Sequence, residues 1–272
     1  MNFSDDIKTL KKLINYDDYM NSKKIIDNEL NISTMTVCCN FINTEIKCSR
    51  ISKLLPLGVN CVVACGSSTL LKTKKKKIIK KKYSFLNQIS LKIVVPDKNP
   101  NNPINVKLFK NGSVQMTGCI TIKDSIDALV RICNILTTKL FNKKKNIKQR
   151  LCTGKDLINS ITKYQIGMIN SNFDIGFWID RNRLLEILKT KKLDVTFDSN
   201  SHASVKIKYP IDDIVITILV FEKGKIIITG SRNYNHLKIA YDYINKLLLS
   251  NYFDIFKVSN NIVYEIAKNW IS

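Results

Sequence analysis

The 272 residues, 44% of them apolar, suffice for one large domain or two small ones, and no run reaches the roughly 18 apolar residues of a membrane-spanning helix. Because 44 Lys and Arg outnumber 22 Asp and Glu, the net charge of +22 favours a polyanionic partner such as nucleic acid, although a genome whose codons favour lysine would produce the same excess. The eight cysteines form no CxxC pair and only two histidines accompany them, so we expect reduced, buried thiols, no metal and no cofactor.

Residues 1–30 are predicted to form a helical, amphipathic extension that contains DDIKTLKKLINYDDYM. The chain opens with acidic residues and has no apolar signal core, so we expect no secretory peptide and a soluble, intracellular protein. The extension could cap a sheet, occupy the concave face of a sheet or bind a partner. The sequence alone does not choose among these roles.

Residues 31–140 read as strand, helix, several antiparallel strands and a final helix. The final helix is predicted over 124–136, with Asp124 or Ser125 as its N-cap. An insert at about 57–84 separates the first helix from the paired strands and contains KTKKKKIIKKK. Low complexity and like charge predict a solvated loop there, and a dedicated phosphate-binding arm is the alternative.

The same pattern recurs over residues 164–250, after a basic linker at 141–163, and a tail of residues 251–272 follows. LFKNGSVQMTG of the first copy returns as VFEKGKIIITG at an offset of 112, and the apolar positions of the flanking strand and helix keep that offset. The first strands, matched at Asn40-Phe41 and Asn172-Phe173, give an offset of 132. These matches predict an internal duplication in which the first copy holds about 20 extra residues.

Period-two alternation sorts the strand residues onto two faces of a sheet. The consistently apolar face, which includes Leu108 and Val220, is the one that the helices must cover, whereas Phe109 and Phe221 fall on the other face. A Phe near a strand end is usually core, but two at matched positions and out of phase with the apolar series favour an open face. Thr, Lys and aliphatic side chains surround them there, a composition suited to the minor groove of DNA.

The doubled phrase resembles the TATA-box-binding protein family, whose two repeats each carry a phrase of the type LIF-SGK-TG before a long helix. MINSNFDIGF resembles the first strand of the second repeat in that family, and the resemblance covers roughly residues 30–250. The lysine and asparagine bias, the insert and the divergence make the chain look like a copy from a large DNA virus. The resemblance implies an α+β, two-repeat saddle, with a curved antiparallel sheet of about ten strands and helices on its convex face.

The resemblance also implies site residues. In this family, two side chains per repeat insert between base pairs and kink the duplex, and the resemblance implies the same here. Asn200 is an alternative to His202 as the first wedge of the second repeat, and Phe197 lies close but needs a gap. The expected wedges are Phe109, Phe221, Phe85 and His202; the groove floor is Thr34, Thr36, Gln115, Thr117, Met168, Asn170, Ile227 and Thr229; the phosphate contacts are Lys92, Lys107, Lys110, Lys208 and Lys225.

The sequence therefore predicts a non-enzymatic transcription initiation factor that binds and bends A·T-rich promoter DNA through the minor groove. Its expected partners are double-stranded promoter DNA, a general transcription factor B-like protein and the RNA polymerase machinery, in a viral factory, a virion or the host nucleus. The alternative is a recruitment platform with weak or non-specific DNA binding. An enzyme built on the same fold would need an attached catalytic domain, for which the tail is too short.

Overall fold

The computed structural model describes residues 3–25, 30–55, 62–65, 68–69, 87–142 and 146–258, with the backbone alone at 62–65 and 68–69. The chain forms two compact units. Unit 1 comprises Met1–Asn21 and Thr34–Gly167, and unit 2 comprises Ser22–Ser33 and Met168–Ser272. Each unit combines an antiparallel sheet with helices, so the α+β character predicted from the alternating strand and helix patterns is confirmed.

Unit 1 holds the sheet β1-β6-β5-β4-β2-β3, in which all neighbours are antiparallel. A separate hairpin, β7–β8, follows α4, and the first half of β9 begins at Ile161. The elements are α1 (Phe3–Leu13), α2 (Tyr16–Lys23, which ends in unit 2), β1 (Asn31–Phe41), α3 (Cys48–Leu54), β2 (Val62–Cys65), β3 (Ser68–Thr69), β4 (Gln88–Ile93), β5 (Ile104–Phe109), β6 (Ser113–Cys119), α4 (Ile122–Thr137), β7 (Leu140–Asn142), β8 (Ile147–Gln149) and β9 (Ile161–Asp174).

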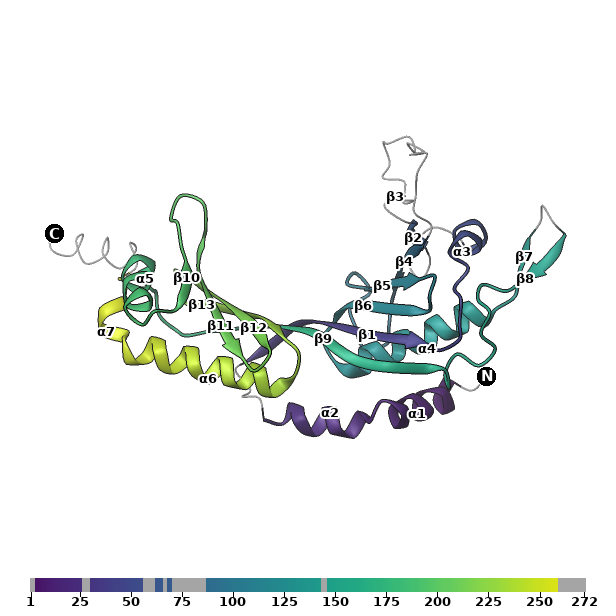
Figure 1. Cartoon of the computed structure of the whole chain (residues 1–272), viewed down its shortest axis with the longest axis horizontal. Coiled ribbons are helices and arrows are strands. Elements are labelled where there is room, and N and C mark those ends of the chain that lie inside the picture. The colour runs from purple at the N-terminus through teal and green to yellow at the C-terminus, as the bar shows by residue number, and fades with distance from the viewer. Residues whose placement is uncertain are drawn as a thin grey trace, which may run out of the picture. The chain divides into compact units, whose positions relative to one another are not determined.

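Unit 2 holds the second half of β9 at one edge of the antiparallel sheet β9-β13-β12-β11-β10. Its further elements are α5 (Arg181–Thr190), β10 (Asp194–Thr196), β11 (Ser204–Ile211), β12 (Ile214–Phe221), β13 (Lys225–Ser231), α6 (Tyr234–Ser250) and α7 (Tyr252–Ile255). Figure 1 shows α4 along one face of the unit 1 strands and α6 along one face of the unit 2 strands.

Strand register shows which positions of the two units are equivalent. Cys39 pairs with Val114, and Phe173 pairs with Ile226, which is the partner of Val114 at the offset of 112. Cys39 and Phe173, 134 residues apart, are therefore equivalent, and the predicted offset of 132 is wrong by two residues. The dipeptide Asn-Phe occurs in both strands at positions that the sheet does not align.

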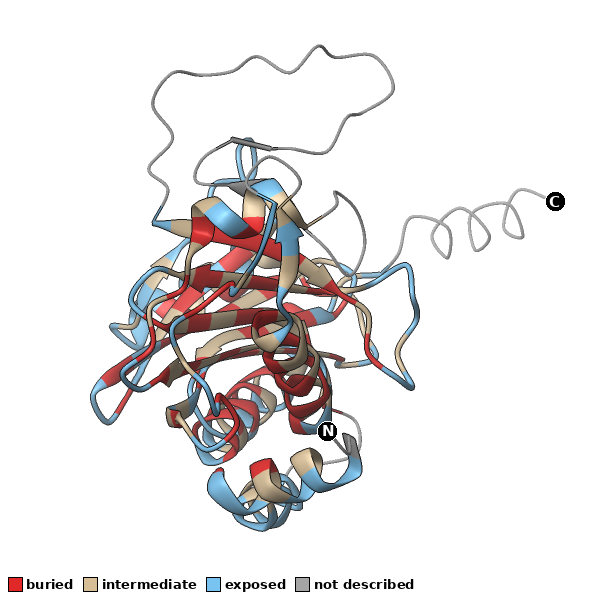
Figure 2. Ribbon diagram, turned by 90° about the vertical axis from the view of Figure 1, so that its right-hand side faces the viewer, coloured by how far each residue is buried: buried red, intermediate tan, exposed pale blue. Residues whose placement is uncertain are grey.

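The core of each unit lies between its sheet and its helices (Figure 2). In unit 1, Leu108 and Met116 of the sheet and Leu129 of α4 are fully buried. In unit 2, Val220 and Ile228 of the sheet and Leu237 of α6 are also fully buried. The apolar face predicted from strand alternation is thus the face that the helices cover.

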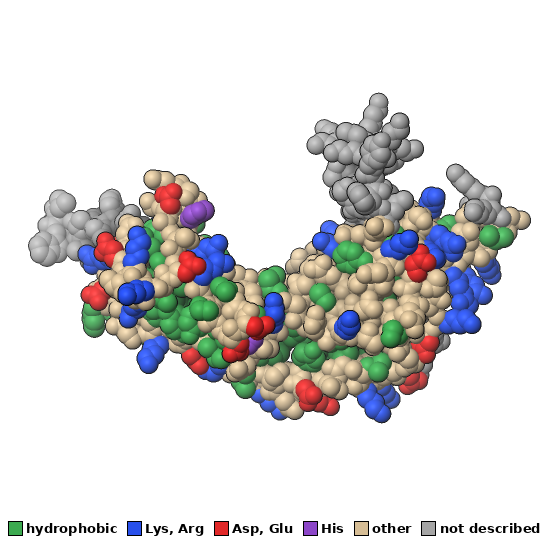
Figure 3. Space-filling model, viewed as in Figure 1, with side chains coloured by type: hydrophobic (Ala, Val, Ile, Leu, Met, Phe, Trp, Pro, Cys, Tyr) green, Lys and Arg blue, Asp and Glu red, His purple; other side chains and the backbone are tan. Residues whose placement is uncertain are grey.

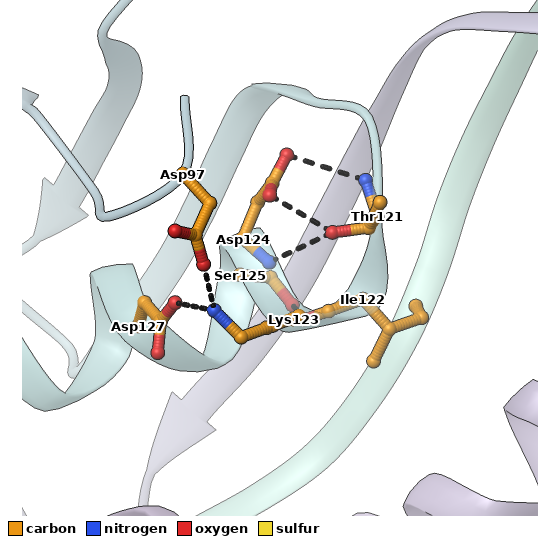
Figure 4. Close-up of polar contacts among 7 residues, drawn as sticks. All are labelled: Asp97, Thr121, Ile122, Lys123, Asp124, Ser125 and Asp127. Atoms are coloured by element: carbon orange, nitrogen blue, oxygen red, sulfur yellow. Dashed lines mark hydrogen bonds and ion pairs between the residues drawn. The ribbon is translucent and has the colours of Figure 1, made fainter. Parts of the chain in front are cut away.

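The start of α4 differs from the prediction. Thr121, not Asp124 or Ser125, is the N-cap, and its Oγ1 accepts a bond from the Asp124 backbone N–H at 3.1 Å (Figure 4). The Asp124 carboxylate accepts the Thr121 backbone N–H at 3.2 Å in return, which completes a capping box. Lys123 adds a brace, since its Nζ lies 2.8 Å from Asp97 and 3.2 Å from Asp127.

The N-terminal helix α1 packs against α4, so the first part of residues 1–30 covers a helix of unit 1. Leu10 is fully buried and Ile14 almost so. The Tyr19 ring meets the Tyr164 ring edge to face at 5.8 Å, and the Tyr164 hydroxyl lies 2.6 Å from Ser125 Oγ of α4. Burial raises the pKa of Tyr164, so this hydroxyl stays protonated.

Part of the predicted linker is folded structure. Its start forms the β7–β8 hairpin, and the chain beyond β8 returns to the body of unit 1, where Cys152 bridges to Ile46 and Leu151 and Leu157 are buried. These buried apolar residues are scattered among basic ones, so the composition of the segment does not predict that it is folded. The predicted division into extension, repeats, linker and tail remains a proposal.

Candidate nucleic-acid interface

Each sheet has one face that no described helix covers, and we call it the open face. Side chains there are half-buried and alternate with fully buried ones, as in β12, where Leu219 and Phe221 flank buried Val220. In β5 the half-buried Phe109 follows fully buried Leu108 in the same way. The prediction that both phenylalanines lie out of phase with the core is therefore confirmed.

Antiparallel register arranges the open face of unit 2 into rows that cross the strands. One row is Asn170, Thr229, Thr217 and Lys208, and the next is Asn172, Ile227, Leu219 and Lys206. A third row, closest to the β12–β13 turn, contains Asp174 opposite Lys225 and Phe221 opposite Ser204. Polar and apolar groups thus share the face, with Lys206 and Lys208 on β11, next to the edge strand β10.

Unit 1 repeats this arrangement. The rows are Thr36, Thr117, Asn105 and Lys92; Cys38, Gln115, Lys107 and Ser90; and Asn40 opposite Ser113 with Phe109 opposite Gln88. Thr117 and Thr229 occupy equivalent positions, as do Lys92 and Lys208. The duplication therefore extends to side chains on the open face as well as to the core.

The Thr-Gly that ends each doubled phrase marks a break in the ladder. Strand register shifts beside Thr117 in unit 1 and beside Thr229 in unit 2. Gly118 and Gly230 have φ of 93° and 96°, a left-handed conformation in which a glycine carries no steric cost. Each irregularity bends the strand next to the row that contains Thr117 in unit 1 or Thr229 in unit 2.

The polar groups of the two open faces are engaged differently. In unit 2, Thr229 donates to the Asn170 side-chain oxygen, and Lys208 donates to Thr217 Oγ1 at 2.8 Å. In unit 1, Thr117 donates to a backbone carbonyl, that of Asn105, at 3.4 Å, and Ser113 donates to the Asn40 side-chain oxygen at 3.2 Å. A ligand would therefore compete with side-chain bonds on both faces, but only in unit 2 does the threonine of the Thr-Gly phrase take part in one.

The phenylalanines stand beside open hollows. Phe109 and Asn87 are among the residues that line a cavity of about 1050 Å³ in unit 1, and Phe221 and Ala203 are among those that line one of about 400 Å³ in unit 2. A phenylalanine ring beside such a hollow can insert between two base pairs without movement of the protein backbone. The structure contradicts neither assignment, and both remain predictions.

The predicted first wedges have a weaker structural basis. Phe85 lies outside the described residues. His202 is exposed in the turn between β10 and β11, where its N–H bonds the Asp198 carbonyl at 2.8 Å. The Asp198 carboxylate holds the same turn through Ser201 Oγ at 2.7 Å, the main reason that its pKa is lowered.

Phe197, the alternative that needed a gap, is already engaged. The Arg181 guanidinium lies over its ring at 5.0 Å from the ring centroid. Arg181 also donates to the Ala203 carbonyl at 2.8 Å, which ties α5 to the turn that carries His202. A base that stacked on Phe197 would have to displace this cation–π contact.

The predicted groove floor and phosphate contacts fall on the open face or at its turn. Thr36 lies opposite Thr117 and Asn170 opposite Thr229, and Thr34 and Met168 lie two residues earlier on their strands. Lys110 follows Phe109 in the β5–β6 turn, 59% exposed and 3.8 Å from Glu45. Alternation places Asn105, Thr217 and Leu219 on the open face, although they are not among the predicted site residues. Reasoning from sequence missed Cys38, Asn172 and Lys206, which continued alternation along β1, β9 and β11 would have identified.

The cysteines carry no sign of chemistry in the described part of the chain. Cys39, Cys48, Cys119, Cys133 and Cys152 are buried, and burial raises the pKa of Cys39 and of Cys119 to about 12. Thiols with such a pKa stay protonated and unreactive at neutral pH. Among the described residues, no group of three or more His, Cys, Asp or Glu could hold a metal, and no helix is long and apolar enough to cross a membrane.

Comparisons with known proteins bear on the whole arrangement. The family described as "Transcription factor TFIID (or TATA-binding protein, TBP)" matches residues 163–250. A TATA-box-binding protein-like protein of Acanthamoeba polyphaga mimivirus is 34% identical over 279 residues, which cover 92% of this chain and 74% of the relative. Among solved structures, Methanococcus jannaschii TBP has a TM-score of 0.53 at 14% identity, over 82% of this chain and 99% of that chain.

These matches confirm the predicted α+β fold of the TBP type and support a viral origin. They indicate a DNA-binding role connected with transcription, in a family of binding factors rather than enzymes. The extent and identity of the mimivirus match settle the classification. The chain belongs to the TATA-box-binding protein family.

Proposed function

We propose that the chain is a transcription initiation factor that binds A·T-rich promoter DNA in the minor groove, bends it and recruits transcription machinery. The observation that carries the proposal is the placement of Phe109 and Phe221 at equivalent positions of the two open faces, half-buried beside hollows. Aromatic side chains at such positions can enter base steps and kink the duplex, the habit for which this family is the type case.

The innermost positions of the open face suit A·T base pairs. Thr117 and Thr229 carry small hydroxyls, and Ile227 and Leu219 form an apolar pair across β13 and β12. The minor-groove edge of an A·T pair lacks the guanine amino group, so an apolar side chain can lie against it without leaving a hydrogen-bond donor unpaired. Lys92 lies opposite Asn105, and Lys208 lies between Thr217 and Asp194 of the edge strand β10; both lysines are proposed to meet phosphates.

Recruitment is proposed to use the helix side of the molecule. On unit 2 this side exposes apolar groups, among them Leu249 at the end of α6 and Phe253 of α7, the latter 92% exposed. Large exposed apolar groups close together are typical of protein-binding surfaces. A general transcription factor B-like protein and the polymerase machinery are the proposed partners.

The proposal is tested by DNA bending. A duplex with an A·T-rich element, labelled at both ends with a fluorescence donor and acceptor, reports the bend, and the Phe109→Ala/Phe221→Ala double variant should lose most of it. Affinity should fall by roughly 100-fold if each wedge contributes about 1–2 kcal/mol, as aromatic stacking on bases does. Unchanged bending and affinity in this variant would remove the wedge assignment.

A second candidate is a recruitment platform that binds DNA weakly and without sequence preference. It is favoured by Asp174, which stands opposite Lys225 on the open face of unit 2 and opposes the approach of phosphate. Binding to A·T-rich and mixed-sequence duplexes at several salt concentrations separates the two. Equal affinities with a steep salt dependence would support the platform, because backbone attraction alone would then explain binding.

A further inference from the structure

Five cations gather at one end of unit 1, over α3 and the β7–β8 hairpin; we call them the basic flank: Arg50, Lys53, Lys139, Lys148 and Arg150. All five are exposed, and none has an ion-pair partner among the residues that the structure describes. Figure 3 shows Lys and Arg side chains gathered over this end of unit 1. Lys143, Lys144 and Lys145 are outside the described residues and carry no part of the inference.

The basic flank is a built surface rather than a scatter of charges. Arg50 donates to the Arg150 carbonyl at 3.2 Å, which joins α3 to the segment after β8. Helix α3 also contacts β7, and Lys148 of β8 stands opposite Phe141 of β7. The Lys47 backbone N–H bonds the Leu151 carbonyl at 2.8 Å, so helix and hairpin are held to one body.

At the corresponding end of unit 2, two cations are paired with a carboxylate. Ile179 bonds the Glu222 carbonyl there as Ile46 bonds the Lys110 carbonyl in unit 1, so the two turns are equivalent. Arg181 and Lys257 each lie 2.6 Å from the Glu222 carboxylate. The carboxylate near the turn of unit 1, Glu45, pairs with Lys47 and Lys110 and attracts Arg50 of the basic flank without forming an ion pair with it.

The basic flank continues the open face of unit 1 beyond Phe109. Lys110 follows Phe109 in the turn, and its carbonyl accepts a hydrogen bond from the Ile46 backbone N–H. Helix α3 begins at Cys48, two residues after Ile46. DNA that is kinked at Phe109 would therefore leave the open face toward α3 and the hairpin. Flexible lysines suit phosphate oxygens there, since they position DNA without reading its sequence.

We propose that the basic flank binds the phosphate backbone of the duplex next to the A·T-rich element. The inference rests on the proposed function, because it needs the element to lie on the open face. The flank then adds affinity that depends on DNA length and salt and is indifferent to the flanking sequence. An acidic protein segment would be the competing occupant, but the proximity of the proposed DNA surface favours nucleic acid.

The test compares a short duplex that ends at the A·T-rich element with a long duplex that extends one helical turn beyond it on each side. The variant Lys53→Gln/Lys139→Gln/Lys148→Gln removes three exposed charges that make no described side-chain bond. Lys189→Gln/Lys191→Gln/Lys246→Gln, at exposed positions in or directly after helices of unit 2, is the control of equal charge. Thermal unfolding of both variants verifies that the fold is unchanged.

The flank variant should bind the long duplex about 10-fold more weakly at moderate salt, with a slope of log affinity against log salt that is smaller by up to about 2.7, or 0.9 for each phosphate contact. Its affinity for the short duplex, and that of the control variant for both duplexes, should change less than twofold. An equal loss on both duplexes would overturn the inference, since it would reflect net charge alone. No loss on either would also overturn it and would point to an acidic protein.

Failure of the proposed function gives a different result. In that case the unaltered protein would not prefer the A·T-rich short duplex over a mixed-sequence short duplex. The flank inference fails instead when the preference is present but the long duplex gains nothing from Lys53, Lys139 and Lys148. The two measurements therefore assign a negative outcome to one proposal or the other.

Discussion

The turns that follow Phe109 and Phe221 share their backbone geometry, but their first residues carry opposite charges. Lys110 stands in one turn and Glu222 in the other, at the offset of 112 that relates the two copies. Glu222 draws Arg181 and Lys257 into a network inside unit 2, whereas Lys110 faces solvent beside Glu45. The comparison teaches that duplication preserved the geometry that holds each phenylalanine, while the charges around it diverged.

The largest effect is expected where that shared geometry depends on glycine. A Cβ at Gly112 would stand 2.6 Å from the Phe41 carbonyl oxygen, and one at Gly224 would meet the Phe177 carbonyl oxygen even more closely. Gly112→Ala and Gly224→Ala should each lower the free energy of unfolding by about 2–4 kcal/mol, since the clash adds to the 1–2 kcal/mol cost of a left-handed residue. Urea denaturation measures the loss.

Gly176→Ala is the matched control. Gly176 has a φ of 86°, close to those of the turn glycines, but a Cβ added there would have no described atom within 4 Å beyond its own chain neighbours. Its substitution should cost only about 1–2 kcal/mol, the conformational part alone. If all three variants lose the same stability, the carbonyl oxygens near Gly112 and Gly224 are not the reason that these turns need glycine.

The next effect concerns the two wedges taken singly. Phe221→Ala should abolish the kink on its side, because the other predicted wedge of unit 2, His202, sits in an exposed turn. Phe109→Ala should leave part of the bend if Phe85 contributes, and each change should weaken binding by roughly 10-fold. Fluorescence bending measures both, and Phe253→Ala on α7 is the aromatic control. Equal residual bends would contradict the asymmetry.

The smallest effect tests the divergent charges. The hydrogen bond from Lys257, aided by Arg181, holds the pKa of Glu222 below its usual value of 4.5. A lowered carboxylate pKa contributes stability above that usual value and loses it as pH falls through the folded-state value. Glu222→Gln should therefore cost about 1 kcal/mol at pH 7 and less at pH 3, because the contribution of the carboxylate declines as pH falls below 4.5.

Unfolding of Glu222→Gln at the two pH values measures this difference, with Glu45→Gln as the unit 1 counterpart. The Glu45 side chain is more exposed than that of Glu222, 40% against 28%, so its substitution should leave stability nearly unchanged. A loss at Glu45 as large as that at Glu222 would mean that the two turns do not differ electrostatically in the way their contacts indicate.

Side-chain period explains why much of the open face could be predicted from sequence. Alternation in a strand is a local property, so Phe109 and Phe221 were assigned to the correct face without knowledge of their neighbours. The offset of 132 was wrong by two residues, yet an error of two leaves every side chain of β1 on its proper face. The predicted groove-floor residues therefore kept their orientation despite the misalignment.

Features that depend on distant residues escaped prediction. Glu222 meets Arg181 and Lys257 from well-separated parts of the sequence, and no local pattern announces such a network. The folded part of the linker depends on buried Leu151 and Leu157 within a basic stretch. The N-cap of α4 was a different kind of miss, because Thr121 and Asp124 form a local box that lies one turn earlier than the apolar stripe suggested.

The packing of α1 on α4 has a consequence for the order of folding. Helix α1 is synthesised before α4, and Leu10 and Ile14 gain their cover only when α4, more than 100 residues later in the chain, has been made. Contacts of such sequence separation form slowly and leave apolar surface open during synthesis. Helix α1 is therefore made early but is among the last parts of unit 1 to be packed, so substitutions at Leu10 or Ile14 would act on a late step of folding.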